Sequence, residues 1–173
     1  KVFVTLNTLV TDDEFAALTA ELDDIAKAHA DAVIVQDMGV MSLIRARYPE
    51  LPLYASTQTT VHNAEGAVLL DKLGFKQVVL ARELSAKEIR AIQAASPIQI
   101  ECFVHGAHCM CMSGACYLSA MLGGRSGNRG LCAQPCRLNF KLGKKERALS
   151  LKDMCLIGHM EELMQSGIHA LKI

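Results

Sequence analysis

The stretch DAVIVQDMGVMSLIRARYPELPLYA, residues 31–55, decides the fold. It contains an apolar, β-branched run at Ala32–Val35, a helix-like segment at 40–47 and a second apolar run at Leu53–Ala55. A strand, a helix and two short loops need a spacing of this size between consecutive runs. The stretch therefore predicts one β/α unit of a parallel sheet that is buried on both faces.

The same alternation continues in both directions. Further strands are expected at Val2–Leu6, Val78–Ala81, Ile98–Val104 and Ala170–Ile173. Further helices are expected at 12–29, 60–73, 86–95 and 150–166, with a short one at 117–122. The pattern predicts an α/β fold of the parallel (β/α) TIM-barrel type, incomplete because about six of the roughly eight β/α units are present. An open doubly wound sheet is the alternative, and we expect the chain to be an internal portion of a longer protein.

Several helix ends carry local signals. A Thr or Ser followed three residues later by an acid is typical of a capping box, as in Thr11 with Glu14, Ser85 with Glu88 and Ser150 with Asp153. Gly74 and Gly167 stand where a helix would end in the left-handed conformation. These signals support the assignment of the helices.

The alternation stops after Val104. The next 45 residues hold most of the cysteines and a glycine-rich stretch at 123–130. We therefore divide the chain into β/α barrel units at 1–104, a Cys-rich basic insertion at 105–149 and the last β/α unit of the same barrel domain at 150–173.

Charge is distributed unevenly, although the formal net charge of the 173 residues is zero. Residues 121–147 carry seven basic side chains against one acid, Glu146. Such a stretch can bind phosphates if it folds over the barrel mouth, and it is otherwise a solvated loop. The side chains expected to contact RNA are Arg125, Arg129, Arg137, Lys144 and Lys145. No apolar run reaches the length of a membrane span, so we expect no membrane partner and a cytoplasmic protein.

Seven cysteines lie in the second half of the chain: Cys102, Cys109, Cys111, Cys116, Cys132, Cys136 and Cys155. An odd count of clustered thiols, in a chain without an export signal, indicates metal or cluster ligands rather than disulfides. Structural zinc sites usually have two close cysteine pairs, and only one pair here comes near that pattern. The spacing favours an iron–sulfur cluster, with zinc and with inert or catalytic thiols as alternatives.

Polar residues follow the expected strands at the edge where barrel enzymes place their active sites. They are Asn7, Gln36, Asp37, Ser56, Thr57, Gln58, Arg82, Glu83 and His105. The catalytic candidates are His105, Glu101, Arg82 and Glu83, and His105 is the one we expect nearest to a substrate. A loop cap or an ion pair is the alternative role for each.

The segment ECFVHGAHCMCMSGACYLS, residues 101–119, resembles the signature of peptidase family U32, the collagenase-like proteases. That signature runs E-x-F-x-x-G-A-x-C-x4-G-x-C-x-L-S. The matching positions are Glu101, Phe103, Gly106, Ala107, Cys109, Gly114, Cys116, Leu118 and Ser119. GGRSGNRGLCAQPCR, VTLNTLV, ASTQTT and VVLARELS extend the resemblance over nearly the whole chain, and His108 departs from it because the family usually has an aliphatic residue there.

The resemblance implies an RNA hydroxylation protein of the kind that forms 5-hydroxycytidine in ribosomal RNA, with RNA and a small oxygen donor as partners. It implies a 4Fe-4S cluster bound by Cys109, Cys116, Cys132 and Cys155, with Cys136 as a competing ligand. Cys102 should point away from this site along its strand, and Cys111 should be a packed thiol. The alternatives are a collagenase-like peptidase, using a Cys109 or Cys116 thiolate with His105 as base, and a non-catalytic iron–sulfur scaffold.

Overall fold

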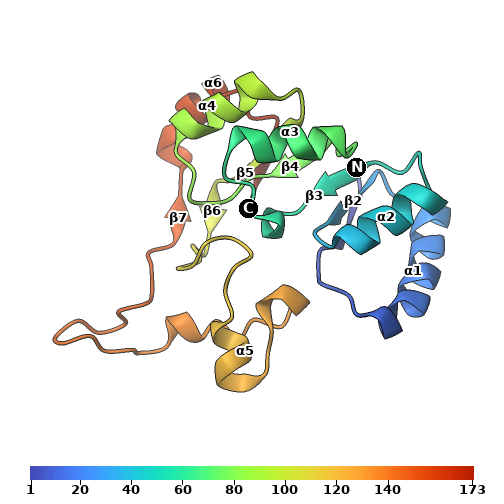
Figure 1. The fold of residues 1–173 in the computed structure, drawn as a ribbon. Helices are drawn as coiled ribbons and strands as arrows, with labels where there is room; N and C mark the ends of the chain where they lie inside the picture. Colours follow the sequence, from blue (N-terminus) through green and yellow to red (C-terminus); the bar gives the residue numbers. More distant parts are fainter.

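A computed structural model describes residues Lys1–Ile173 (Figure 1). Six parallel strands form one sheet: β1 (Phe3–Leu6), β2 (Ala32–Val35), β3 (Leu53–Ala55), β4 (Gln77–Val79), β5 (Gln99–Phe103) and β8 (Ala170–Lys172). The helices that accompany them are α1 (Phe15–Lys27), α2 (Met38–Arg47), α3 (Ala64–Lys72), α4 (Ala86–Ala95) and α6 (Met160–Gln165). The expected β/α alternation is therefore confirmed.

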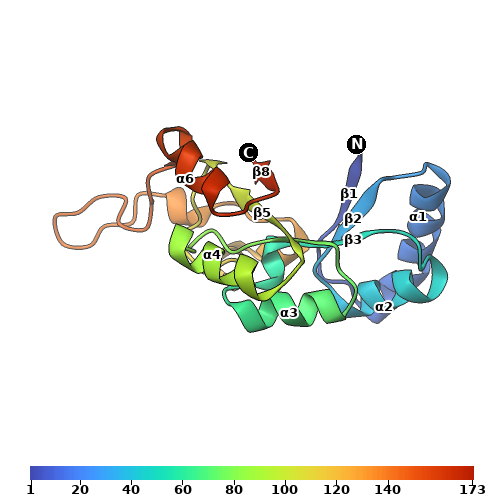
Figure 2. The ribbon, with the colours of Figure 1, turned by 90° about the horizontal axis from the view of Figure 1, so that it is seen from above.

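The order of the strands in space follows their order along the chain. The sheet runs β1-β2-β3-β4-β5-β8, and every pair of neighbours is parallel. Figure 2 shows the sheet as an open arc with helices on its outer side and with β1 and β8 at its two ends. A doubly wound sheet reverses its strand order part-way, so the alternative prediction is wrong.

The hydrophobic core lies between the sheet and the outer helices. Val33 and Val35 of β2 belong to this core with Leu22 of α1 and Ile44 of α2. Alternate residues of a strand face opposite sides, so Ile34 faces the inner side of the arc, where it lines a cavity. All four residues of β2 are buried, as expected for a strand covered on both faces.

Side-chain caps set the helix starts. The capping boxes at Thr11 and Ser85 are present, the second with Ser85 Oγ accepting from the Glu88 N–H. The third helix begins at Ala64 rather than at residue 60, because Asn63 caps it by accepting from the Gly66 N–H at 2.9 Å. Gly74 and Gly167 have φ of 85° and 79°, which confirms their role after α3 and α6.

The helix expected at 150–166 is wrong in its first half. Residues up to Asp153 are irregular, β7 (Met154–Cys155) follows, and α6 begins only at Met160. Ser150 and Asp153 do not cap a helix, because both bind the Arg137 guanidinium, at 3.1 and 3.0 Å. β7 instead pairs antiparallel with β6 (His105–Gly106).

Residues 107–153 leave the sheet and return to it at this β6–β7 ribbon, and we call them the cysteine segment. The segment contains α5 (Leu118–Gly123), close to the expected short helix, and adds no strand to the six-stranded sheet. Its residues 138–149 form an arm that projects away from the rest of the molecule (Figure 1). No helix is long and apolar enough to cross a bilayer.

Candidate functional site: a thiol-lined cavity at the mouth of the sheet

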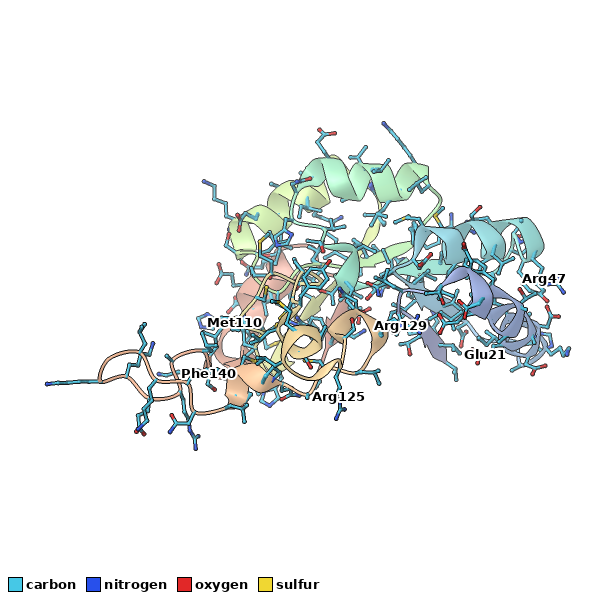
Figure 3. The ribbon with its side chains drawn as sticks, turned by 60° about the horizontal axis from the view of Figure 1, so that its bottom comes forward. Glu21, Arg47, Met110, Arg125, Arg129 and Phe140 are labelled. Atoms are coloured by element: carbon cyan, nitrogen blue, oxygen red, sulfur yellow. The ribbon has the colours of Figure 1, made fainter.

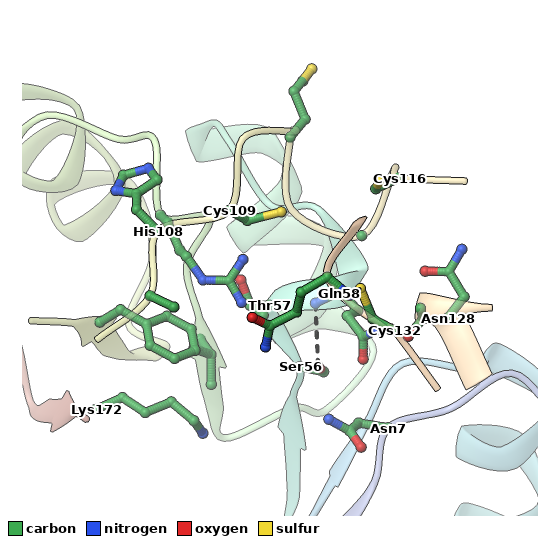
Figure 4. Close-up of a pocket in the computed structure, with 18 of the residues that line it drawn as sticks. Asn7, Ser56, Thr57, Gln58, His108, Cys109, Cys116, Asn128, Cys132 and Lys172 are labelled. Carbon is green, nitrogen blue, oxygen red and sulfur yellow. Dashed lines mark hydrogen bonds between the residues drawn. The ribbon is translucent and has the colours of Figure 1, made fainter. Parts of the chain in front are cut away.

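A cavity of about 380 Å³ lies where the carboxyl ends of the strands meet the cysteine segment, and we call it the mouth cavity. Thr5, Ile34 and Val79 line it from the strands, and Gly114 and Asn128 line it from the segment. Figure 4 shows Cys109, Cys116 and Cys132 on one side and Asn7, Ser56 and Lys172 on the other. The structure thus places a set of thiols at the end of the sheet where barrel enzymes bind their substrates.

Four cysteines line the mouth cavity: Cys109, Cys116, Cys132 and Cys136. Burial raises the pKa of the Cys136 thiol, and the nearby thiol of Cys109 raises it further. The Gln134 N–H donates to Cys132 Sγ at 3.4 Å, the kind of backbone contact that orients a sulfur ligand. Three of the four ligands implied by the family resemblance therefore line the same cavity, and Cys136 lines it with them.

The other three cysteines lie elsewhere. Cys155 is exposed on β7 and does not line the mouth cavity. Cys102 points into the hydrophobic core as expected, and burial raises its pKa to about 12. Cys111 is half-buried beside Cys116. Burial is the main cause that raises the pKa of Cys111, and the charge of Cys116 raises it further.

The donor set of the mouth cavity suits a thiolate-bound metal centre. No three His, Cys, Asp or Glu side chains lie close enough together to hold a metal ion without rearrangement. The metal-binding side chains of the cavity are four thiols, the imidazole of His108 and the thioether of Met112, and none of the lining residues is a carboxylate. Thiolates are the ligands of iron–sulfur clusters and of structural zinc, so the chemistry of the donors fits either group.

Gly114 seats the loop that carries Cys109 and Cys116. Its φ is 79°, and an added Cβ would lie 2.5 Å from the Gln58 carbonyl oxygen. Beside it, Thr60 Oγ1 donates to the Ser113 carbonyl oxygen at 2.7 Å, and the Ser113 N–H donates to Glu83 Oε1 at 2.6 Å. Only glycine allows this close approach to the β3–α3 connection, which explains the residue's place in the signature.

The glycine-rich stretch is docked on the ends of the first three strands. The Asn128 carbonyl oxygen accepts from the Leu9 N–H at 2.9 Å and from Gln36 Nε2 at 3.1 Å. Gln58 Nε2 donates to the Gly127 carbonyl oxygen at 3.3 Å. Gln36 and Gln58 therefore hold the loop that leads to Cys132.

Arg137 connects three parts of the cysteine segment. Its guanidinium donates to the His108 carbonyl oxygen at 3.2 Å, to Ser150 Oγ, to the Leu151 carbonyl oxygen and to Asp153. The residue lies next to Cys136, and its partner His108 lies next to Cys109. Arg137 thus fixes the backbone beside two of the four cavity thiols.

The four catalytic candidates occupy different places. Arg82 lines the mouth cavity, with its guanidinium carbon 4.6 Å from the centre of the Phe103 ring. Glu101 is buried below it and pairs with Lys172 Nζ at 3.2 Å. Glu83 is engaged with Ser113, and His105 is exposed on β6, outside the cavity.

Asp37 is a helix cap, since its Oδ1 accepts from the Gly39 N–H at 2.8 Å. Asp37 therefore has the alternative role that we gave to these polar residues, that of a cap. Sequence reasoning missed Lys172 and Asn128 as lining residues, and it noted His108 only as a departure from the family. Strand alternation was a usable signal for Lys172, because it separates this residue from its neighbours Leu171 and Ile173. In the structure β8 pairs Lys172 with Phe103 of β5, and both line the cavity.

The basic residues divide into two kinds. The Arg129 guanidinium forms an ion pair with Glu14, and Figure 3 shows it where the cysteine segment meets the β1–α1 side of the molecule. Arg137 is engaged as described, and Arg125 Nε donates to the Leu131 carbonyl oxygen at 3.0 Å. Lys144 and Lys145 are exposed on the arm, which does not fold over the mouth cavity. The arm therefore does not place its basic side chains over the barrel mouth, where they were expected to bind phosphates.

The sequence profile of peptidase family U32 matches residues 1–173. The chain belongs to this family. A relative named 23S rRNA 5-hydroxycytidine C2501 synthase, from Escherichia coli, is 41% identical over 181 residues, which cover 100% of this chain and 27% of that protein.

Two further U32 relatives carry different names. The tRNA hydroxylation protein P of Helicobacter pylori is 34% identical over 192 residues, and a collagenase of Porphyromonas gingivalis is 32% identical over 194 residues. Each alignment covers 100% of this chain and 46% of the relative. The chain therefore spans less than half the length of these U32 relatives.

A solved structure supports the fold. The U32 peptidase Mk0906 superimposes with a TM-score of 0.53 at 20% identity, over 62% of this chain and 47% of that one. At this level of identity the likeness concerns the architecture alone.

Proposed function

We propose that this chain is the cluster-binding part of a U32 RNA hydroxylation protein that acts on a cytidine of ribosomal RNA. The observation that carries the proposal is the gathering of Cys109, Cys116, Cys132 and Cys136 around one cavity at the carboxyl ends of parallel strands. The name of the Escherichia coli relative supports the reaction and the RNA. Action on ribosomal RNA would take place in the cytoplasm.

In this proposal, the thiols of the mouth cavity bind a 4Fe-4S cluster. Cys109, Cys116 and Cys132 provide three ligands. Cys136 lines the cavity, whereas Cys155 is the fourth ligand that the family resemblance implies. Bound there, a cluster would supply one-electron chemistry or a binding position for a small oxygen donor. The sheet would form part of a (β/α) TIM barrel, closed by residues outside this chain.

The chain's own residues would do two things in that reaction. The amides of Gln36 and Gln58 and the Gly114 turn hold the thiol-bearing loops over the strand ends. The mouth cavity, at about 380 Å³, has the size of a small-ligand site and would shelter the reacting atoms from water. A cytidine base would reach it only by leaving its stack, as sequence-specific RNA recognition usually requires.

Iron and sulfide analysis of the full-length protein, purified without oxygen, tests the cluster. We expect about four iron and four sulfide per chain. Cys109→Ser and Cys132→Ser should lose most of both, and Cys111→Ser, a matched thiol beside the site, should keep them. Whichever of Cys136→Ser and Cys155→Ser loses iron identifies the fourth ligand. A colourless protein with stoichiometric zinc would contradict the cluster.

Mass spectrometry of ribosomal RNA tests the reaction. Deleting the gene should remove 5-hydroxycytidine, and the wild-type gene should restore it where the Cys109→Ser gene does not. Persistence of the modified base in the deletion strain would refute the proposal.

The peptidase alternative has the Porphyromonas gingivalis relative in its favour. Its proposed base, His105, forms a pair with Cys155 in the β6–β7 ribbon and does not line the mouth cavity with Cys109 or Cys116. Gelatin cleavage that disappears in a Cys109→Ala, Cys116→Ala double variant would favour this alternative.

A further inference from the structure

Arg82 carries a positive charge that nothing in residues 1–173 neutralises. Its backbone N–H donates to Ser113 Oγ at 3.3 Å, but its guanidinium makes no hydrogen bond and no ion pair. The guanidinium instead lies over the Phe103 ring, 4.6 Å from the ring centre. A guanidinium has five N–H donors, and none of those of Arg82, which lines the mouth cavity, has a hydrogen-bond partner in the protein.

The other two cations of the mouth cavity are already paired. Lys172 Nζ lies 3.2 Å from Glu101 Oε1, and Arg137 lies 3.0 Å from Asp153 Oδ1. None of the 22 lining residues is an Asp or a Glu. The cavity therefore has one uncompensated positive charge, and it belongs to Arg82.

The position of Arg82 suits the recognition of an oxyanion. The aromatic face of Phe103 supports one face of the guanidinium, as in other arginine–aromatic stacks, and leaves its edge free. That edge can donate two parallel hydrogen bonds to a carboxylate or a phosphate. Asn7 and Gln134 also line the cavity with side-chain amides that have no partner in the protein. A ligand whose anionic group is bound by Arg82 would therefore meet neutral hydrogen-bonding side chains along the rest of its surface.

We propose that the mouth cavity contains an oxyanion subsite at Arg82, which binds the carboxylate or phosphate group of a small organic ligand. A volume of about 380 Å³ suits such a ligand. The subsite goes beyond the proposed function, because it requires neither a cluster nor RNA. Two other roles for Arg82 compete with it: balancing the charge of the cavity thiolates, and contacting an RNA phosphate.

Titration calorimetry of the full-length protein, kept free of oxygen and at low salt, tests the subsite with three probes: succinate, inorganic phosphate and neutral succinamide. We expect at least one of the two anions to bind and succinamide not to bind. Arg82→Gln should weaken anion binding at least about tenfold, because it removes a charge-assisted, two-pronged contact. Arg82→Lys keeps a cation near Phe103 but loses the two parallel N–H donors, so this variant should bind the anions with an intermediate affinity. Retained binding in Arg82→Lys would also show that replacing Arg82 does not unfold the site.

Arg90→Gln is the matched control. Arg90 lies on α4, outside the mouth cavity, and donates to Ser166 Oγ at 3.3 Å. This variant should bind the anions as the wild type does. Thermal unfolding of each variant checks that the fold is retained.

Three results would overturn the subsite. The first is a wild-type protein that binds neither anion. The second is unchanged binding in Arg82→Gln, which would leave charge balance of the thiolates as the role of Arg82. The third is a short RNA that depends on Arg82 while neither small anion binds. Normal iron content and normal ribosomal RNA modification alongside any of these would separate failure of the subsite from failure of the proposed function.

Discussion

The β/α framework of residues 1–104 holds nearly all of the buried hydrophobic side chains, whereas the cysteine segment holds almost none. Within residues 107–153 the buried residues are Ser113, Ser119, Asn128 and Pro135. The three polar ones are engaged in hydrogen bonds that join the segment to the strand ends or join its own parts together. Hydrophobic burial therefore stabilises the framework, and a small number of polar contacts positions the segment.

This difference indicates how the two regions respond to change. A region without an apolar core opens locally at a small cost in free energy. If the cavity thiols bind a metal centre, its binding free energy adds to the stability of the segment and not to that of the framework. Variants of the two regions should therefore affect different observables.

Leu22→Ala should have the largest effect on global stability. Leu22 is fully buried in the core, and truncating such a side chain costs about 2–5 kcal/mol of unfolding free energy. Iron content per folded chain should stay unchanged, because Leu22 is remote from the thiols. Denaturant unfolding of the full-length protein measures the unfolding free energy, and metal analysis measures the iron content.

Leu142→Ala, in the exposed arm, is the control and should change stability by under about 0.5 kcal/mol. Loss of iron in proportion to stability in Leu22→Ala would contradict the comparison.

Gly114→Ala should affect the segment and spare the framework. The new Cβ would meet the Gln58 carbonyl oxygen at 2.5 Å, in a backbone conformation with φ of 79° that costs alanine about 1–3 kcal/mol. We expect faster hydrogen exchange in residues 109–116 and reduced iron content. Gly143→Ala separates clash from conformation, since its φ is 59° and an added Cβ has nothing within 4 Å. Equal iron loss in both variants would remove the clash as the cause.

Arg137→Gln should loosen the segment by about 2 kcal/mol, because it breaks charge-assisted hydrogen bonds to His108, Ser150 and Asp153. Hydrogen exchange at residues 107–109 and 150–153 should rise together. Arg125→Gln, which loses one contact to the Leu131 carbonyl oxygen, should leave both regions as they are. If Arg137→Gln weakened RNA binding without changing hydrogen exchange, Arg137 would act by contacting RNA and not by holding the segment.

The framework was predictable from the sequence because each strand and helix follows from a local pattern. Apolar runs 20 to 30 residues apart predicted the first five strands, the run at Ala170–Ile173 predicted the sixth, and alternation on β5 placed Cys102 in the core. The cysteine segment depends on contacts between residues far apart in the sequence. Ser150 and Asp153 have the spacing of a capping box, but their partner is Arg137. A local pattern contains no information about that partner.

The same limit explains the other differences at the site. A count of basic residues cannot reveal that Arg129 meets Glu14, which is 115 positions away. His105 follows a strand, as active-site residues often do, yet pairing of β6 with β7 leaves it exposed and outside the mouth cavity. The family resemblance named Cys109, Cys116 and Cys132, and all three line the mouth cavity. The choice between Cys136 and Cys155 depends on how the arm returns to the sheet.

Replacing both arm lysines, Lys144→Gln with Lys145→Gln, should change RNA binding and nothing else. Both side chains are exposed, and Leu142 and Lys145 meet through backbone hydrogen bonds that the replacements preserve. Under the proposed function, the affinity of full-length protein for ribosomal RNA should fall several-fold, and the salt dependence should decrease by about one to two in its logarithmic slope. The exposed pair Lys72→Gln with Lys87→Gln, on α3 and after the start of α4, is the control. Equal losses in both double variants would assign the effect to net charge.

The smallest effect is expected from the contact between Glu14 and Arg129, which joins the turn directly before α1 to the glycine-rich stretch. Hydrogen bonding to the Arg129 guanidinium, assisted by Thr11, lowers the pKa of Glu14 from 4.5 to about 2. A carboxyl whose pKa is lower in the folded state stabilises that state above its unfolded pKa, and this contribution disappears as the pH falls from 4.5 towards 2.

Thermal unfolding of the full-length protein between pH 3 and pH 7 measures this contribution against Glu14→Gln. The two proteins should differ most above pH 4.5 and converge as the pH falls, and added salt should narrow the difference because the pair is on the surface. Glu21→Gln, on α1 directly after the turn that holds Glu14, is the control for a change of net charge. A constant difference at every pH would show that the contact acts through packing and not through the charge of Glu14.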